Sequence, residues 1–492
     1  MIDLFRLSHE GSHAALALPL SDAPALHILE IVRRVPGRRL VCRALWNDQQ
    51  VYAKLFIGSH AGRHAARDAA GVRRLVDAGI LTPPLLHVGL VGNDVGTTSA
   101  NVLIFAAIDG ENAENVWRAL DDEGRRQLAT RLVAVVASHH NAGLQQTDLY
   151  LKNFLVAGHC IHTLDGDGIK ALPGLFARRA ALANLVLLLS KFDALETQRW
   201  LDGLLHTYCS ERALPLLDAD SVACRVTARR RKSVDAYANR KVFRNCTDIE
   251  VFNSGRQFLA MARPYSDAAL KSALMSAPDS LLRDSPDVRL KTGNSSTVGL
   301  CTINGRKLVV KRYNIKSFWH GLSRFWRPSR AADSWANAYR LGMYAIPTAV
   351  PVALLETRFG PFRGRAFFVA AHVASPDLAQ YLEDAAVTEA QKKQSVQELA
   401  RLMNKMLLLQ IAHGDLKASN ILVEDGRPVL IDLDSLREYR CKHRFEVAHV
   451  RDLKRLLKNW QDKPQVREWL IAALHEVYGD HALLAGVGIN RI

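Results

Sequence analysis

A set of polar residues that occurs twice in this chain of 492 residues constrains its fold more than any other feature. At one offset of 267 residues, Asp148, Asn153 and Asp165 correspond to Asp415, Asn420 and Asp432. A lysine precedes each set, Lys54 in VYAKLF and Lys311 in LVVKRY, at the similar offset of 257. Four ordered matches at near-constant spacing favour two related domains in tandem.

Each half reads as strands, a helix, more strands and then helices, which is an α+β pattern. In the first half, apolar runs between 26 and 56 are interrupted by Gly37 and by Asn47 with Asp48, which favours strand hairpins. A helix is expected at about 65–78, and helices dominate from about 112 onward. The second half repeats this order from VRLKTGNSSTVG.

The region 216–284 belongs clearly to neither half. It contains a basic run and a hairpin-like segment, IEVFNSGRQFLAMAR, with turn residues in its middle. We therefore predict a first domain over 1–215, a basic α/β insert over 216–284, and a second domain over 285–492.

The composition indicates a cytoplasmic protein. No stretch approaches the ~18 uninterrupted apolar residues that a membrane-spanning helix needs. The first twenty residues do not read as a signal peptide, because His and Glu interrupt them before an apolar core forms. Seven scattered cysteines without a CxxC pair are typical of reduced thiols.

The net charge of +16 predicts attraction to anionic partners or surfaces. Part of this charge is concentrated between Arg225 and Arg244, where a solvated helix or loop face is the competing interpretation. No nucleic-acid-binding motif accompanies the basic run, so no nucleic acid is expected as a partner. A membrane surface or an anionic substrate is the favoured explanation.

The second set of residues has the types and the spacing that phosphoryl transfer requires. That chemistry depends on charges held in place rather than on covalent help from the protein. Asp415 can face the acceptor hydroxyl, and Asn420, at the far end of the same loop, can face Mg²⁺, which prefers oxygen ligands. Lys417 lies between them and can neutralise the γ-phosphate. Asp432 follows a strand, which favours a rigidly placed metal ligand.

A turn of small residues, TGNSSTVG, begins at about the distance before Lys311 where a phosphate-covering loop is expected. Its backbone N–H groups can cover nucleotide phosphates. The residues assigned to this role are Gly293, Ser295, Ser296 and Gly299.

These parts, in this order, resemble the protein-kinase-like fold. The phrases LKTGNSSTVG, VVKRYN, HGDLKASNILV, IDLDSLR and RDLKRLL resemble more closely the bacterial lipopolysaccharide core kinases, which phosphorylate heptose or Kdo sugars. The segment HHNAGLQQTDLYLKNFLV of the first half is similar to the catalytic segment of the same family. The resemblance covers about 25–215 and 285–465, and it implies two tandem bilobal domains, each with a β-rich and a helical lobe.

The resemblance also implies a role for each residue. The catalytic aspartates would be Asp415 and Asp148, and the lysines that anchor ATP would be Lys311 and Lys54. The Mg²⁺ ligands would be Asn420 with Asp432, and Asn153 with Asp165. Asp452 resembles the helix aspartate with which kinases brace the backbone of the catalytic loop.

The first half departs from the family pattern. Gln146 replaces the loop histidine His413, and Asn184 stands where Asp452 is expected. The helix glutamate that usually pairs with the ATP lysine is not evident in either half. Asp68 is a candidate for this role in the first half, and Asp333 or Asn337 in the second. The second half is therefore the better candidate for a working kinase.

The function implied is transfer of phosphate from ATP, with Mg²⁺, to a heptose or Kdo hydroxyl of the lipopolysaccharide inner core. The enzyme would act as a peripheral protein at the cytoplasmic face of the inner membrane, with the core glycan and the anionic membrane surface as its partners. A protein Ser/Thr kinase and a non-catalytic pseudokinase scaffold in envelope assembly are the alternatives.

Overall fold

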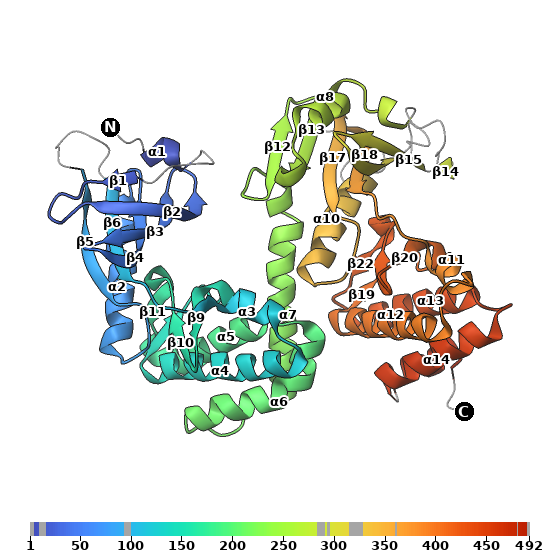
Figure 1. Cartoon of the computed structure of the whole chain (residues 1–492). Coiled ribbons are helices and arrows are strands. Elements are labelled where there is room, and N and C mark those ends of the chain that lie inside the picture. The colour runs from blue at the N-terminus through green and yellow to red at the C-terminus, as the bar shows by residue number, and fades with distance from the viewer. Residues whose placement is uncertain are drawn as a thin grey trace. The chain divides into compact units, whose positions relative to one another are not determined.

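The computed structural model describes residues 4–8, 16–92, 100–282, 291–292, 296–313, 328–359, 362–479 and 481–489. The chain divides into two compact units (Figure 1). Unit 1 comprises Met1–Phe192 and Glu196–Arg229, and unit 2 comprises Asp193–Leu195 and Arg230–Ile492. In each unit an antiparallel sheet precedes a mainly helical part, which confirms the α+β class.

The sheet of unit 1 has six strands in the order β1-β2-β3-β4-β6-β5. Asn47 and Asp48 both have positive φ and form the two-residue turn between β3 and β4, as hairpin geometry requires. The strands are β1 (Leu16–Leu18), β2 (Leu26–Val35), β3 (Arg39–Trp46), β4 (Gln49–Phe56), β5 (Leu85–Val91) and β6 (Ala100–Ala106).

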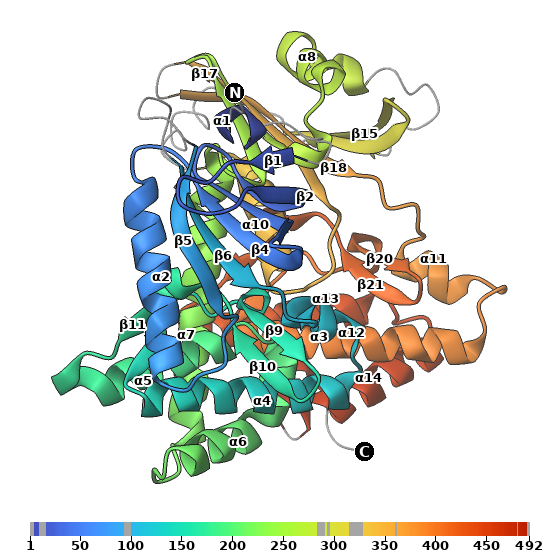
Figure 2. The ribbon, with the colours of Figure 1, turned by 60° about the vertical axis from the view of Figure 1, so that its left-hand side comes forward.

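Helix α2 (Ala61–Asp77) covers part of this sheet and confirms the predicted helix. Its buried face is built from small side chains, including Ala65 and Ala69, that pack with Phe56 and Leu103 of the sheet. Figure 2 shows α2 running beside β5 and β6. Small residues also let the helix backbone lie close to the turn that contains Gly166. At Gly71, a Cβ would lie 1.8 Å from the carbonyl oxygen of Gly166.

The rest of unit 1 is mainly helical, and its core is formed by leucines, valines and the buried Tyr208. Short strand pairs carry the loops between the helices. The helices are α3 (Ala113–Ala119), α4 (Asp122–Asn141), α5 (Ala177–Leu189), α6 (Ala194–Glu211) and α7 (Ala219–Ala238), the last of which continues into unit 2. The short strands are β7 (Glu111–Asn112), β8 (Leu144–Gln146), β9 (Phe154–Ala157), β10 (Cys160–Thr163) and β11 (Ile169–Ala171).

The sheet of unit 2 has seven strands in the order β12-β13-β17-β18-β16-β15-β14. The segment IEVFNSGRQFLAMAR forms the first two of these strands as a hairpin, with β13 also paired to β17. The strands are β12 (Ile249–Asn253), β13 (Gln257–Ala262), β14 (Lys291–Thr292), β15 (Ser296–Ile303), β16 (Arg306–Tyr313), β17 (Pro351–Phe359) and β18 (Phe362–Ala371). Helix α8 (Ala268–Ser276) follows the hairpin, and α10 (Arg330–Met343) packs Ala331 and Trp335 against Leu354 of the sheet.

The helical part of unit 2 is centred on α12 (Glu389–Leu409). A capping box formed by Thr388 and Gln391 begins this helix, and Gln410, in the left-handed conformation, ends it. Its buried face, including Leu399 and Met403, packs with Leu453. The helices are α11 (Leu378–Glu383), α12 (Glu389–Leu409), α13 (Lys442–Lys458), α14 (Pro464–Tyr478) and α15 (Leu483–Val487). The short strands are β19 (Ile411–Ala412), β20 (Ile421–Glu424), β21 (Arg427–Leu430) and β22 (Arg437–Glu438).

Among the described residues, no helix combines the length and the apolar character needed to cross a bilayer.

Candidate active sites

The loop HGDLKASN of unit 2 joins β19 to β20 and is held in place by α13. Asp452 of α13 accepts hydrogen bonds from the backbone N–H of His413 at 2.6 Å and of Gly414 at 3.0 Å. These charge-assisted bonds fix the loop backbone where it has positive φ at Gly414. Burial raises the pKa of Asp452, although the N–H donors oppose this shift. The position predicted to brace the loop therefore does so.

His413 secures the same loop from its other side. Its side chain is fully buried, and its Nε2 lies 3.0 Å from the carbonyl oxygen of Ile431, at the end of β21. Burial lowers the pKa of His413, so the ring is neutral at pH 7 and donates to this carbonyl. The bond links the loop to the strand that leads into Asp432.

The two predicted functional residues of this loop are in contact. The Nδ2 atom of Asn420 donates to the backbone oxygen of Asp415 at 2.9 Å and to its carboxylate at 3.1 Å. The other carboxylate oxygen accepts a bond of 2.8 Å from Arg455 of α13. Lys417 Nζ lies 3.5 Å from the Asp415 carboxylate, so the predicted cation also stands at the predicted base.

Lys311 lies on β16 and pairs with Asp432, as the sequence set requires, and its Nζ is 3.7 Å from Asp434. Asp434 is almost fully buried and also binds Arg330, at the start of α10, at 2.5 Å. Burial alone would raise the pKa of Asp432, but the ammonium group of Lys311 outweighs it and holds this pKa below its usual value.

In unit 1 the corresponding lysine pairs with a helix aspartate in addition to the aspartate of the repeated set. Lys54 on β4 pairs with Asp68 of α2 at 2.7 Å and with Asp165 at 3.2 Å. Asp68, a candidate from the sequence, is thus the helix carboxylate that meets the lysine. Burial raises the pKa of Asp68 despite Lys54, whereas Lys54 and Arg39 overcome burial and lower the pKa of Asp165.

In unit 2 the helix candidates have other partners. Asp333 pairs with Arg437 at 3.5 Å. Asn337 donates to the carbonyl oxygens of Leu433 and Leu436, which follow Asp432 in the chain. The Asn337 side chain of α10 therefore holds the segment after Asp432 by bonding to the backbone carbonyl groups of that segment.

The metal candidates share an unusual backbone conformation in both units. Asp165 has φ 68° and Asp432 has φ 60°, and each precedes a short 3-10 helix. A left-handed conformation at a residue other than glycine costs free energy and is concentrated at functional sites. In both units it turns a carboxylate towards the lysine.

The loop of unit 1 keeps the same internal bond but not the same brace. Asn153 Nδ2 donates to the backbone oxygen of Asp148 at 2.7 Å, as Asn420 does to Asp415. Asn184, in the place of Asp452, donates to the backbone oxygen of Gln146 at 2.8 Å. The carboxylate of Asp148 itself is exposed.

Gln146 and Tyr150 replace two other loop residues in unit 1. Gln146 donates to the carbonyl oxygen of Leu164 at 3.0 Å. Leu164 corresponds to Ile431, whose carbonyl oxygen accepts from His413 in unit 2. Tyr150 stands where unit 2 has Lys417, and Lys191 Nζ lies 3.8 Å from the centre of its ring. Lys152 of the loop lies over the same ring at 5.0 Å, so Tyr150 has one cation from the loop and one from the turn after α5.

The predicted phosphate-covering turn is only partly described. Gly293 and Ser295 lie outside the described residues, while Ser296 and Gly299 are on β15, whose Val298 pairs with Lys311. A Cβ on Gly299 would lie 3.2 Å from the side chain of Leu282, so tight packing also accounts for glycine there.

The predicted basic run is partly neutralised within unit 2. Arg231 pairs with Glu438 at 2.8 Å, Lys241 lies 3.6 Å from Asp248, and Arg230 is buried. These contacts give part of the run a structural role.

The sequence analysis missed Asp434, Arg330, Arg455 and Lys191. Asp434 was recoverable, because the set LIDLDS contains two aspartates and Asp167 occupies the same place in the first half. Arg455 lies three residues after Asp452 in the quoted phrase RDLKRLL, although its contact with Asp415 was not predicted. Arg330 and Lys191 are distant in the sequence from the loops that they serve, and no local pattern indicates them.

The donor set of unit 2 fits magnesium. Because Asn420 Nδ2 donates to Asp415, its Oδ1 is the amide oxygen left for a cation. Asp432 offers a carboxylate that is one-third exposed and ionised at neutral pH. An amide and a carboxylate oxygen are ligands that Mg²⁺ accepts. No group of three or more His, Cys, Asp or Glu side chains within the described ranges is arranged to hold a metal.

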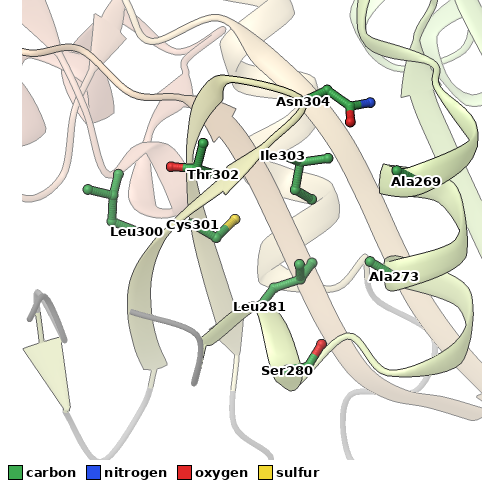
Figure 3. Close-up of a pocket in the computed structure, with 9 residues that line it drawn as sticks. All are labelled: Ala269, Ala273, Ser280, Leu281, Leu300, Cys301, Thr302, Ile303 and Asn304. Carbon is green, nitrogen blue, oxygen red and sulfur yellow. The ribbon is translucent and has the colours of Figure 1, made fainter. Parts of the chain in front are cut away.

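A cavity of about 510 Å³ lies elsewhere in unit 2, between α8 and β15 (Figure 3). Cys301 and Leu281 are among its lining residues, and none of the predicted site residues is.

A lysine on the sheet, a braced Asp-x-x-x-x-Asn loop and an acidic residue after a strand define a phosphotransferase with an α+β protein-kinase-like fold. Residues 55–194 and 283–478 match the model of the Lipopolysaccharide kinase (Kdo/WaaP) family. These segments make up more than half of the chain, which therefore belongs to this family of kinases.

Among solved structures, the chain is similar to one described as WaaP in complex with acyl carrier protein. The identity is 18%, the match covers 47% of this chain and 92% of that chain, and the TM-score is 0.31. No curated protein matches the chain.

Proposed function

We propose that this chain is an ATP- and Mg²⁺-dependent kinase that phosphorylates a heptose or Kdo hydroxyl of the lipopolysaccharide inner core. Family membership supports the class of reaction and the use of ATP. The observation that carries the proposal is the loop of unit 2, in which Asp415 and Asn420 are bonded to each other and braced by Asp452.

In this proposal Lys311 anchors the nucleotide phosphates from β16, and Asn420 Oδ1 with Asp432 holds Mg²⁺. The metal, when bound, neutralises charge on the phosphate oxygens. Asp415 accepts a hydrogen bond from the acceptor hydroxyl, whose oxygen attacks the γ-phosphorus as the bond to the leaving ADP oxygen breaks. The proton passes to Asp415, and Lys417 stabilises the negative charge of the transferred group.

Arg455 is a positioning residue in this mechanism. It binds one oxygen of Asp415 while Asn420 binds the other, so the carboxylate has a defined orientation. Its guanidinium is half exposed, so its contribution is orientation more than stability.

We further infer that the chain is a tandem duplication of kinase-like domains over 1–215 and 285–492. The basic region 216–284 lies between them in the sequence, and its hairpin of β12 and β13 belongs to the sheet of unit 2. The shared Asn-to-backbone bond, the Gln146 and His413 bonds to equivalent carbonyls, and the left-handed Asp165 and Asp432 support this inference. We assign the transfer reaction to unit 2. Unit 1, with Lys54, Asp148, Asn153 and Asp165, keeps the set for nucleotide and metal binding.

The acceptor is a membrane-anchored anionic glycan, so the proposed place of action is the cytoplasmic face of the inner membrane. The net charge of +16 supports attraction to both the glycan and the anionic lipid surface.

The test is incorporation of labelled phosphate from ATP into purified core acceptor by the full-length chain. We expect Asp415→Asn to lower the rate by about a thousandfold, since general acid–base contributions are of this order. The matched control is Asp425→Asn, the same change on an exposed turn of unit 2, which should leave the rate unchanged.

Unchanged transfer by the Asp148→Asn, Asp415→Asn double variant would refute the assignment of these aspartates. Label on protein acceptors instead of the glycan would favour the protein kinase. Absence of Mg²⁺-dependent ATP binding in calorimetry would favour the scaffold.

A further inference from the structure

Unit 1 carries an apolar tip that the fold leaves in solvent. A single 3-10 turn, Gly174–Phe176, connects β11 to α5. Leu175 is 98% exposed and Phe176 is 64% exposed. Leu175 is the most exposed of the large hydrophobic residues in the described part of the chain. Such exposure adds nothing to folding, and adjacent apolar side chains that point outward are typical of an interaction site.

The tip is held in place by its neighbours. Phe176 N–H donates to the carbonyl of Pro173 at 2.9 Å, and Leu172 N–H donates to that of Gly143 at 2.7 Å. Strand β11 pairs with β8, with Ile169 opposite Gln146. Because β8 leads directly into the loop of Asp148, the tip is attached to the candidate site of unit 1 by a short strand pair.

Positive charge surrounds the tip. Lys170, Arg178 and Arg179 are exposed, and no carboxylate among the described residues forms a salt bridge with them. The chain has no acidic residue between Ile169 and Phe192. An apolar tip flanked by unpaired cations is the arrangement that binds an anionic lipid surface, because the cations meet the headgroups while the apolar side chains enter below them.

The corresponding turn of unit 2 has a different character. Between β22 and α13 it contains Tyr439, Arg440 and Cys441. Tyr439 is partly buried, and its ring lies 6.2 Å from that of Phe445. At the offset of 267, however, Tyr439 corresponds to Leu172, which is also partly buried. Leu175 and Phe176 correspond to Lys442 and His443, which are exposed and polar, so the exposed apolar pair in unit 1 is not a consequence of the fold.

We propose that Leu175 and Phe176 insert into the anionic face of a membrane, with Lys170, Arg178 and Arg179 binding the lipid headgroups. The inference deepens the proposed location of the enzyme and rests on that part of the proposed function alone. It places the candidate site of unit 1 next to the lipid surface in which the acceptor is anchored.

The test is sedimentation of the full-length chain with vesicles of phosphatidylcholine, alone or mixed equally with phosphatidylglycerol, without ATP or acceptor. The Leu175→Ser, Phe176→Ser double variant should bind the anionic vesicles at least tenfold more weakly. The Arg178→Gln, Arg179→Gln variant should bind more weakly and with a smaller salt dependence. Leu216→Ser is the matched control, since Leu216 is 66% exposed in the same unit, and it should bind as the unaltered chain does.

A second measurement locates the contact. Tryptophan at position 176 (Phe176→Trp) should be quenched by lipids brominated on their acyl chains, relative to the unaltered chain. Sedimentation of this variant without such quenching would overturn the proposal, because another surface would then bind the membrane. Failure of the unaltered chain to bind anionic vesicles would also overturn it and leave the tip to a protein partner.

The outcome is separable from that of the kinase assay. The Leu175→Ser, Phe176→Ser variant should phosphorylate a deacylated, water-soluble core acceptor at the unaltered rate. A kinase that fails on all glycans but still requires the tip for vesicle binding would refute the proposed reaction and not this inference.

Discussion

The Asp-x-x-x-x-Asn loops of the two units are held by hydrogen bonds of opposite direction. In unit 2 the carboxylate of Asp452 accepts from two backbone N–H groups. In unit 1 the amide of Asn184 instead donates to the backbone oxygen of Gln146, while its oxygen lies 3.1 Å from His140. A loop geometry can therefore persist while the polarity of its support is reversed, provided that each buried polar group has a partner.

The lysine sites differ in where their acids come from. Lys54 pairs with Asp68 of α2 and with Asp165, which follows β10. Lys311 instead meets two aspartates of one segment, Asp432 and Asp434, which follow β21. In unit 2, α10 contributes no carboxylate to the lysine among the described contacts but packs on the site through other residues. Ser334 bonds to Tyr313, and Arg330 binds Asp434. Both units have a second cation near the lysine, but it is placed differently. Arg330 binds the buried Asp434 directly in unit 2, whereas in unit 1 Arg39 lies 3.7 Å from Asp165, and Lys54 makes the one salt bridge to Asp68 found among the described residues.

The largest expected difference follows from the placement of this second cation. Lys54→Met leaves the fully buried Asp68 without its partner, and removing one member of a buried pair costs about 3–5 kcal/mol. Lys311→Met should cost less than half as much, since Asp434 keeps Arg330 and Asp432 is partly exposed.

Hydrogen exchange of α2 and α10 measures these losses separately in the two units. Lys152→Met, at an exposed position of unit 1, is the control. Equal losses in both units would show that Arg330 does not support Asp434.

Exchanging the two braces should harm each loop. Asp452→Asn removes one charge-assisted acceptor, which we expect to lower the stability of unit 2 by about 1.5–3 kcal/mol. Asn184→Asp removes the donor to Gln146 and places a carboxylate beside a carbonyl oxygen, so it should destabilise unit 1 by a similar amount. Denaturant unfolding followed by hydrogen exchange of the loop peptides tests both. A stabilising effect of Asn184→Asp would contradict the reversed polarity.

Acid should weaken unit 1 through His140. Burial lowers the pKa of His140 to about 4, against 6.5 when unfolded, so only the unfolded state binds this proton between those values. Stability is therefore lost as pH falls from 6.5 towards 4, by about 1.4 kcal/mol per pH unit, or about 2 kcal/mol at pH 5.

The replacement His140→Gln should remove this part of the loss from unit 1 alone. His449 in unit 2, whose pKa is also lowered to about 4 by burial and whose ring bonds to Tyr478, serves as the internal reference. Hydrogen exchange of α4, which carries His140, and of α13, which carries His449, at pH 7 and pH 5 makes the comparison. Equal pH dependence of α4 in variant and parent would rule out His140 as the source.

The smallest effect is expected for His413→Gln. Because Gln146 already makes the equivalent bond in unit 1, glutamine should replace histidine in unit 2 at a cost of less than about 1 kcal/mol. His413→Ala, which leaves the Ile431 carbonyl unbonded, should cost about 1–3 kcal/mol. Thermal unfolding distinguishes the two, and equal losses would mean that packing, not this bond, is what His413 provides.

Much of the fold was accessible from the sequence because its signals are local. Asn47 and Asp48 mark a hairpin, and the small apolar face of 61–77 marks a helix packed on a sheet. The pairing of Lys311 with Asp432 followed from their place in the repeated set. The contacts of Arg330, Arg455 and Lys191 did not, since they depend on the rotation and register of α10 and α13 and on where α5 ends.

The sequence by itself determined the α+β class, the membership of the kinase family and the residues that form each loop, because spacing along the chain sets which polar groups share a turn. Only the tertiary structure decided which acid meets each lysine, whether a brace accepts or donates, and that Leu175 and Phe176 point into solvent. The physical reason is that these outcomes depend on distances between elements remote in the chain, where one helical turn brings a different side chain to the site.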